Sequence, residues 1–154
     1  MIGRSKKQVF NEIKERVGKK LMGWKEKLLS IGGREILIKA VAQAVPTYTM
    51  GCFLLPKSLC DEMEGMMRNF WWGQKHQESK IAWVSWSNMC RAKRDGGMGF
   101  RDLQAFNLAM LAKQGWRMLE EPSSLMARVY KAKYFPNCDV LGASIGSNPS
   151  FAWR

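Results

Sequence analysis

Apolar residues recur at helical spacing in the first part of this 154-residue chain. They form one stripe with a residue at every fourth position: Val9, Ile13, Val17 and Leu21. A spacing of three or four residues places side chains on one face of an α-helix. Ser5, with Gln8 three residues later, has the form of a capping box at the start of that helix. The pattern predicts an amphipathic helix that docks through one face.

The segment from Ser30 to Pro46 is mostly apolar and predicts a buried helix from about Gly33 to Val45. Pro46 cannot donate a helical hydrogen bond and restricts the residue before it, so we expect the helix to stop there. The apolar residues 48–55 lie between two prolines. They fit either an extended crossing segment or a helix that continues after a kink.

A helix rich in methionine is predicted after the second proline. It begins at Ser58, ends at Gly73 and has one apolar face: Leu59, Met63, Met66, Met67, Phe70 and Trp71. Residues 74–80 predict a polar loop. The aromatic segment 81–86 fits either a short strand or a buried turn.

Two further helices and a loop-rich end complete the pattern. The longest helix runs from Leu103 to Leu119 behind the capping residue Asp102, and the last follows the break at Pro122. After Pro136 the chain is rich in Gly, Ser, Asn and Pro, which predicts loop. The fold class that follows is mainly α: a single helical domain of five or six helices, which we expect to be incomplete at both ends.

The formal net charge of +12 says nothing about the fold but indicates the kind of partner. Ten Lys or Arg and three Glu lie between Arg4 and Arg34. This balance favours a polyanionic partner, RNA or DNA, over the alternative of a solvated basic face. The candidate phosphate contacts are cations of this basic arm and of the helix behind it: Lys6, Lys7, Lys14, Lys19, Lys20, Lys25, Lys27, Arg34 and Lys39.

No catalytic or metal-binding constellation is evident in the sequence. The one histidine, His76, lies among polar residues and predicts a solvated loop side chain rather than a base. Asp61 and Glu64 share a helix face, but a place in the first turn suits dipole stabilisation better than acid–base chemistry. The four cysteines lack zinc-type spacing and predict buried free thiols in a reducing compartment. We expect no catalytic residue, no metal, no cofactor and no small-molecule substrate.

Two further features have competing explanations. The glycine cluster 96–99 would cradle a phosphate through its N–H groups, but it lacks the ending of a P-loop, so a plain turn is preferred. The tryptophan pairs 71/72 and 83/86 are either stacking platforms for single-stranded nucleic acid or core residues. The core interpretation is preferred, because these residues stand at helical spacing beside Met and Phe.

No signal peptide and no membrane span are predicted. The basic N-terminus has no apolar region behind it, and the longest apolar run is far short of the roughly 20 residues that cross a bilayer. A membrane-surface role is a weaker alternative to nucleic-acid binding, so no membrane partner is expected.

The order of motifs along the chain resembles the reverse transcriptase polyprotein of plant non-LTR (LINE-type) retrotransposons. The matching stretches are Trp24–Ser30, Gly33–Arg34, Leu37–Lys39, Val45–Tyr48, Leu55–Pro56, Phe70–Gly73, Lys80–Trp83, Gly96–Asp102, Asn107, Leu111–Gln114, Trp116–Arg117 and Lys133–Pro136. They cover essentially the whole chain and are specific together, although each is weak alone. The resemblance places the chain downstream of the polymerase palm, in the thumb and the linker before the zinc-binding and ribonuclease H regions.

The resemblance implies three parts: a basic helical arm (1–34), a helical thumb- and linker-like region (35–136) and a loop-rich, truncated C-terminus (137–154). In a thumb-like bundle of this kind, a basic helix would track the primer–template backbone. No catalytic residue is carried over, because the family's paired aspartates lie in the palm and no Asp-Asp occurs in this chain. The family's zinc ligands would come after the last residue.

Short free-standing copies of this region occur as uncharacterised open reading frames in plant mitochondrial genomes, and the chain resembles those. The implied location is therefore the mitochondrion, although no import signal is visible. We expect a catalytically inactive fragment of a reverse transcriptase with no independent activity. The alternative is a nucleic-acid-binding module that keeps a thumb-like grip on the phosphate backbone. A polymerase subunit acting in trans is least favoured, because it would need a palm from another chain.

Overall fold

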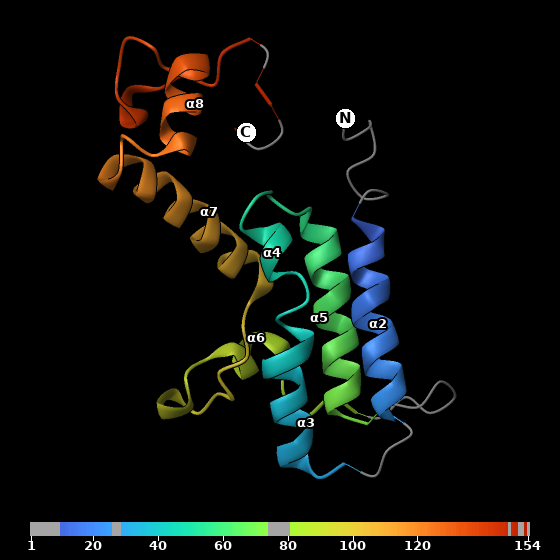
Figure 1. Cartoon of the computed structure of the whole chain (residues 1–154). Helices are drawn as coiled ribbons and strands as arrows, with labels where there is room; N and C mark the ends of the chain where they lie inside the picture. The colour runs from blue at the N-terminus through green and yellow to red at the C-terminus, as the bar shows by residue number, and fades with distance from the viewer. Residues whose placement is uncertain (1–9, 26–28, 74–80, 148, 151–152, 154) are drawn as a thin grey trace.

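The computed structural model describes residues 10–25, 29–73, 81–147, 149–150 and 153 (Figure 1). Within these ranges seven segments are α-helical and none is a β-strand, which confirms the mainly α prediction. The α-helices are α2 (Asn11–Lys25), α3 (Ile31–Leu37), α4 (Thr47–Met50), α5 (Lys57–Trp71), α6 (Trp86–Cys90), α7 (Leu103–Glu120) and α8 (Leu125–Tyr134). Three short turns are the π-helical η1 (Ile38–Ala42) and the 3-10 turns η2 (Lys93–Asp95) and η3 (Val140–Gly142).

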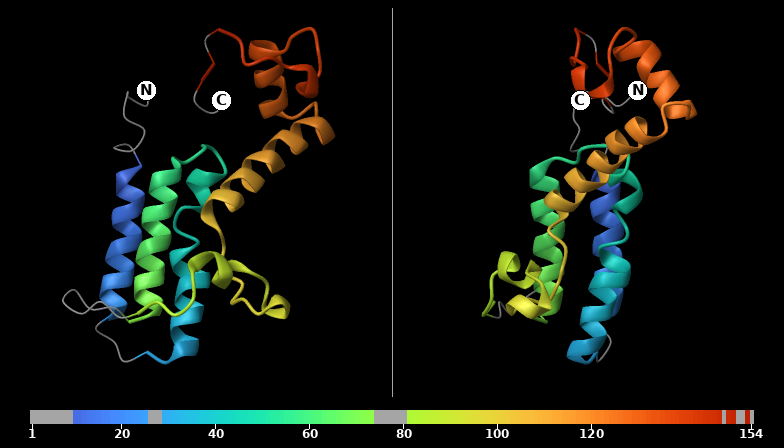
Figure 2. Two further views of the ribbon diagram at one scale, coloured as in Figure 1. Left: turned by 180° about the vertical axis from the view of Figure 1, so that it is seen from behind. Right: turned by 90° about the vertical axis from the view of Figure 1, so that its left-hand side faces the viewer.

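The helices form a bundle and an arm. In the bundle, α2, α5 and the continuous helix made of α3 and η1 run side by side (Figures 1 and 2). The long helix α7 leaves this bundle at an angle, and α8 lies at its far end. The two parts are therefore joined mainly through α7.

The bundle core lies between α2 and α5. The apolar stripe predicted on α2 is confirmed in its described part, where Val17 and Leu21 are buried and Ile13 packs against the same core. On α5 the predicted methionine face is buried, with Met63 and Met67 fully enclosed. Full burial of side chains of this size contributes roughly 1.5–3 kcal/mol each, so this interface supplies much of the stability of the bundle.

The helix predicted over residues 33–45 begins two residues earlier and widens in its second half. Ser30 is the N-cap, and its hydroxyl accepts a hydrogen bond from the Gly33 N–H (3.1 Å). In the π-helical turn, the Gln43 N–H donates to the Ile38 carbonyl five residues back (2.9 Å). Such single turns are rare inside helices and shift the side chains that follow them.

Only the second half of this helix is buried as predicted. Ile38 and Ala42 are fully enclosed, whereas Ile31 and Ile36 are 69% and 65% exposed. The prediction of a wholly buried helix is therefore wrong for α3. Ile31 lies in the first turn of α3, which extends beyond the ends of α2 and α5 (Figures 1 and 2). Ile36 is two residues from both Arg34 and Ile38, so it lies on the opposite side of the helix from these inward-facing residues.

Residues 48–55 and 81–86, for which the sequence allowed two alternatives each, are mostly loop. Residues 47–50 form one helical turn, after which the chain crosses to α5 without regular structure. Residues 81–85 form neither a strand nor a buried turn, and Trp83 is 77% exposed. Trp86, the first residue of α6, is buried and stacks on the ring of Phe100 at 5.1 Å between ring centroids.

The buried side chain of Asn107 joins α7 to the segment between α4 and α5. Its Oδ1 accepts a hydrogen bond from the Leu55 N–H (2.8 Å), and its Nδ2 donates to the carbonyls of Met50 (2.8 Å) and Phe53 (3.0 Å). The residue is 1% exposed, and all three partners are backbone groups that have no helical partner in this segment. Asn107 therefore fixes both the path of the crossing segment and the position of α7.

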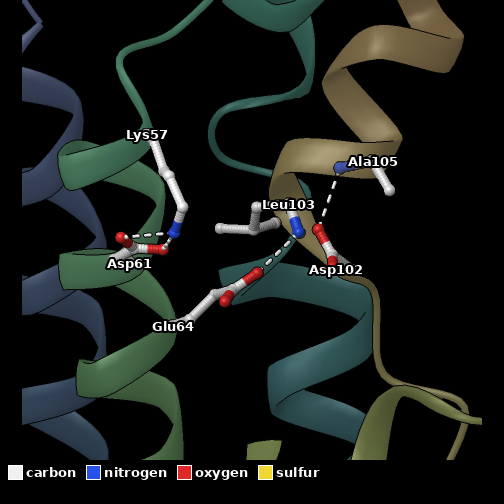
Figure 3. Close-up of polar contacts among 6 residues, drawn as sticks. All are labelled: Lys57, Asp61, Glu64, Asp102, Leu103 and Ala105. Carbon is white, nitrogen blue, oxygen red and sulfur yellow. Dashed lines mark hydrogen bonds and ion pairs between the residues drawn. The ribbon is translucent and has the colours of Figure 1, made fainter. Parts of the chain in front are cut away.

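A second contact holds the start of α7 (Figure 3). Glu64 Oε1 on α5 accepts a hydrogen bond from the Leu103 N–H (2.7 Å), while the Asp102 side chain caps the helix by accepting from the Ala105 N–H (2.8 Å). Both carboxylates lie at the positive end of the helix dipole. Glu64 is half-buried, and the loss of hydration raises its pKa. The hydrogen bond from the Leu103 N–H opposes this increase, and the negative charge of Asp102 adds to it.

The acidic residues of α5 differ from the sequence-based interpretation. Because α5 begins at Lys57, neither Asp61 nor Glu64 lies in its first turn. Asp61 instead pairs with Lys57 one turn earlier, at 2.9 and 3.0 Å. Glu64 stabilises the N-terminus of another helix, α7 (Figure 3).

The far end of the arm is closed by aromatic rings. Trp153 stacks in parallel on Tyr134 at 4.7 Å and lies 5.6 Å from the ring of Phe135, which is buried. The Ser150 N–H donates to the Tyr134 hydroxyl (3.1 Å). Trp153 therefore packs against the end of α8, while Phe151 lies outside the described residues.

We expect Asn107→Ala to lower the free energy of unfolding by roughly 3 kcal/mol, because it leaves three buried backbone groups without partners at about 1–3 kcal/mol each. Urea denaturation followed by circular dichroism measures this change. Gln104→Ala, an exposed position on the same helix, serves as the control and should change stability by less than about 0.5 kcal/mol. Equal effects of the two substitutions would contradict the role assigned to Asn107.

We expect Glu64→Gln to stabilise the protein at neutral pH but not at acidic pH. Glutamine keeps an oxygen for the Leu103 N–H and carries no charge to desolvate. Because the folded state raises the pKa of Glu64, folding favours its protonated form, and this contribution is lost as pH rises through the folded-state pKa. The advantage of the variant should therefore grow as pH rises from the acidic range through the raised pKa of Glu64. Asp61→Asn, at an exposed carboxylate, is the control and should show no such gain.

Candidate nucleic-acid interface

Three cations of α2 are exposed on the side that faces away from the core: Arg16, Lys19 and Lys20. This side follows from the helical period, because Val17 and Leu21 turn toward α5. Within the described part of the chain, none of the three cations has an ion-pair or hydrogen-bond partner. Glu12 and Glu15 are also exposed, one helical turn before Arg16 and Lys19. The three exposed cations therefore lie in the middle of α2, after its two glutamates.

Four of the predicted contacts cannot be placed. Lys6, Lys7 and Lys27 lie outside the described residues, and so does the side chain of Lys25, the last residue of α2. Their role at a phosphate backbone stays a prediction.

Lys14 lies at the edge of the core and already has a carboxylate partner. Its Nζ is 2.9 Å from the carboxylate of Glu62 on α5, and the two side chains are 29% and 35% exposed. The pair links α2 to α5, although a partly exposed ion pair contributes only about 0–1 kcal/mol. A phosphate at Lys14 would have to share this cation with Glu62.

Arg34 points into the bundle rather than toward solvent. Its guanidinium donates to the Trp71 carbonyl at the end of α5 (3.1 Å), where carbonyls lack helical partners and a cation favours the helix dipole. Gly73 follows with φ of 63°, and a Cβ there would lie 3.2 Å from the guanidinium. Glycine therefore suits position 73 because of both the positive φ and the close approach of the guanidinium. Arg34 joins α3 to the end of α5.

Lys39 also has partners within the protein. Its Nζ lies 2.8 Å from Glu35 one turn earlier, and 5.6 Å from the centre of the Phe100 ring. Lys93 approaches the same carboxylate at 2.8 Å. The hydrogen bonds from Lys39 and then Lys93 lower the pKa of Glu35. This cluster holds the loop after α6 against α3.

The structure thus separates the nine predicted contacts into three groups. Lys19 and Lys20 are exposed without partners, three cations are engaged inside the protein, and four lie outside the description. Sequence reasoning missed Arg16. Its spacing of three and four residues from Lys19 and Lys20 was the signal that places it beside them on the helix surface.

The glycine cluster 96–99 is a turn, as preferred. Its backbone N–H groups are occupied: that of Gly97 donates to the Ala92 carbonyl (3.1 Å) and that of Gly99 to the Arg91 carbonyl (2.8 Å). A Cβ on Gly97 would lie 2.1 Å from the Arg91 oxygen, so only glycine allows this approach. The N–H groups are therefore not available to cradle a phosphate.

The core interpretation holds for three of the four tryptophans. Trp71 and Trp72 are partly buried and pack against the core, and Trp86 is buried. Trp83 departs from the pattern because it precedes α6 in an exposed loop.

In the part of the chain that the structure describes, no group of three or more His, Cys, Asp or Glu is placed to hold a metal ion. None of the described helices is both long and apolar enough to cross a membrane. His76 lies outside the description. An open groove of about 590 Å³ between the segment after α4, α7 and α8 is lined mostly by apolar residues, including Leu54, Leu111 and Met118.

Comparison with known proteins finds two plant relatives. An uncharacterised mitochondrial protein of Arabidopsis thaliana is 45% identical over 112 residues, which are 72% of this chain and 73% of that protein. A putative ribonuclease H protein of the same plant is 40% identical over 131 residues. These are 85% of this chain but only 21% of that protein, so the chain spans about a fifth of its length. No family model and no solved structure matches.

We expect Arg34→Ala to lower the free energy of unfolding by roughly 1.5–3 kcal/mol, because it removes a charged donor from a partly buried carbonyl. Lys19→Ala should change it by less than about 0.5 kcal/mol, because Lys19 is exposed and unpaired within the described residues. Chemical denaturation of the two variants measures both values. A stability loss of the same size in both would contradict the division between structural and surface cations.

Proposed function

We propose that this chain, which belongs to the same family as the uncharacterised mitochondrial protein of Arabidopsis thaliana, binds the phosphate backbone of RNA or DNA and carries out no catalysis of its own. By this proposal it is a fragment of a non-LTR retrotransposon reverse transcriptase that keeps a thumb-like role. The observation that carries the proposal is the exposed cationic surface in the middle of α2, which has no partner among the described residues and is here called the α2 basic surface: Arg16, Lys19 and Lys20.

The chemistry of this surface supports a backbone ligand. Internal carboxylates and carbonyls already engage Lys14, Arg34 and Lys39, so those cations are partly neutralised. The cations of the α2 basic surface stay free to exchange counterions for phosphates, which is the main source of sequence-independent affinity for nucleic acid. The net charge of +12 adds long-range attraction for a polyanion.

The retrotransposon origin is supported by the order of the sequence motifs and by the second relative. A match to about a fifth of a putative ribonuclease H protein is what one segment of a longer polyprotein would give. Ribonuclease H activity is not part of the proposal, because the chain covers so little of that protein. The absence of an Asp-Asp pair in the sequence supports a non-catalytic role. The name of the first relative supports a mitochondrial location.

We expect the purified chain to bind duplex DNA in a strongly salt-dependent way. Replacing Arg16, Lys19 and Lys20 together by Gln should weaken binding at low salt. It should also make the plot of log affinity against log salt shallower by roughly 2.7, at about 0.9 for each lost phosphate contact. Fluorescence anisotropy over a salt series measures this slope.

A charge-matched triple variant is the control. Arg91, Arg128 and Lys131 are exposed cations outside α2, and replacing them by Gln removes the same net charge. This variant should keep most of the slope. Equal slopes in the two triple variants would reject the α2 basic surface, and salt-independent binding by the wild type would reject backbone binding altogether. Primer extension with the same protein should show no nucleotide incorporation.

A further inference from the structure

The side of α7 that faces away from the groove carries an aromatic ring between cations. Lys113, Trp116 and Arg117 stand three and four residues apart, which places them together on one helix face. Trp116 is 61% exposed, the Arg117 side chain is 51% exposed, and Lys113 is exposed as well. We call these three residues the outer face of α7.

No other element covers this face in the described structure. α7 contacts the bundle through α4 and α5 and the far end through α8 and η3. Its buried residues, Leu103, Asn107 and Met118, and the groove residues Leu111 and Gly115 turn to other sides of the helix. In both views of Figure 2, α7 runs as a single rod between the two parts of the molecule.

The cationic and aromatic character continues toward the start of α7. The guanidinium of Arg101 lies over the ring of Phe106 at 4.6 Å, and Arg101 is exposed. Its backbone is held in place by Gln43, whose amide donates to the Arg101 carbonyl (3.3 Å). Phe106 is seven residues, or about two helical turns, before Lys113. This stacked pair therefore lies along the same side of α7 as the outer face.

We propose that the outer face of α7 is a second nucleic-acid site, which takes unpaired nucleotides. One base stacks on the indole of Trp116, and the neighbouring phosphates contact Lys113 and Arg117. This proposal rests on the proposed function and extends it, because the α2 basic surface recognises backbone charge alone whereas a stacking site requires an unstacked base. Aromatic platforms combined with cations are how proteins bind single strands without reading sequence.

Charge favours this ligand over an apolar protein partner. The charged residues along this side are Arg101, Lys113 and Arg117 against Glu120 and Glu121, which leaves a small excess of positive charge. Arg117 lies 3.9 Å from Glu121, and an exposed pair at this distance is easily given up to a phosphate. A large apolar contact would instead use the groove on the opposite side of α7.

The test compares two tryptophans in the full-length chain. Trp116→Ala removes the proposed platform, and Trp83→Ala removes an indole that is even more exposed, from a loop outside α7. Anisotropy titrations use a labelled ~20-nucleotide oligo-dT and its duplex with oligo-dA at low salt. Trp116→Ala should weaken single-strand binding by about 5- to 100-fold and duplex binding by less than about twofold. Trp83→Ala should leave both unchanged.

Two further variants separate stacking from folding. Trp116→Phe keeps an aromatic face and should restore most of the single-strand affinity, whereas Trp116→Leu keeps apolar bulk and should not. Thermal melts of each variant confirm that the fold is intact. The proposal is overturned if Trp116→Ala binds the single strand as the wild type does, if Trp83→Ala weakens it equally, or if Trp116→Leu binds as well as Trp116→Phe. It is also overturned if Trp116→Ala changes only self-association, measured by sedimentation.

Failure of this proposal can be told apart from failure of the proposed function. If the variant with Arg16, Lys19 and Lys20 replaced binds duplex as the wild type does, the α2 basic surface is rejected, while a selective effect of Trp116→Ala on single strands still supports the outer face of α7. If duplex binding depends on α2 but Trp116→Ala has no selective effect, only the second site is rejected. If the wild type binds neither probe, both are rejected.

Discussion

The desolvated amide of Asn107 is the constraint on which the arrangement of the whole molecule depends. The chain crosses from α4 to α5 without regular structure of its own, so its backbone groups need partners from elsewhere. One side chain supplies three of them and ties that crossing to α7. Glu64 adds a second tie from α5 to the first turn of the same helix. With both in place, the arm can leave the bundle in only one direction.

The positive charges of the protein serve two different purposes. Near helix ends and in the loop after α6, cations satisfy carbonyls and carboxylates, as Arg34 and Lys39 do. In the middle of α2 and on one side of α7 they have no strong partner within the described residues. A count of charges along the sequence mixes these two populations. Burial and hydrogen bonding separate them, because a cation that already holds a carboxylate gains less from a phosphate.

The sequence was informative where local physics decides the outcome. The apolar stripes of α2 and α5, the cap at Asp102 and the turn at the glycine cluster follow from spacing and from the demands of the backbone. The inward direction of Arg34 could not be predicted, since it depends on where the end of α5 comes to lie. The exposure of Ile31 likewise depends on how far α3 extends beyond the neighbouring helices. Tertiary position, which no local pattern records, accounts for these differences.

The attachment of α7 gives the molecule a mechanical character. Two of its three buried residues, Leu103 and Asn107, lie in the first half of the helix, and the helix continues for 18 residues in all. At 1.5 Å per residue it is a rigid bar about 27 Å long, clamped at one end. A tilt of about 10° at the clamp would carry the other end through roughly 5 Å. Small changes in the tilt of α7 near Asn107 would therefore become large displacements of α8.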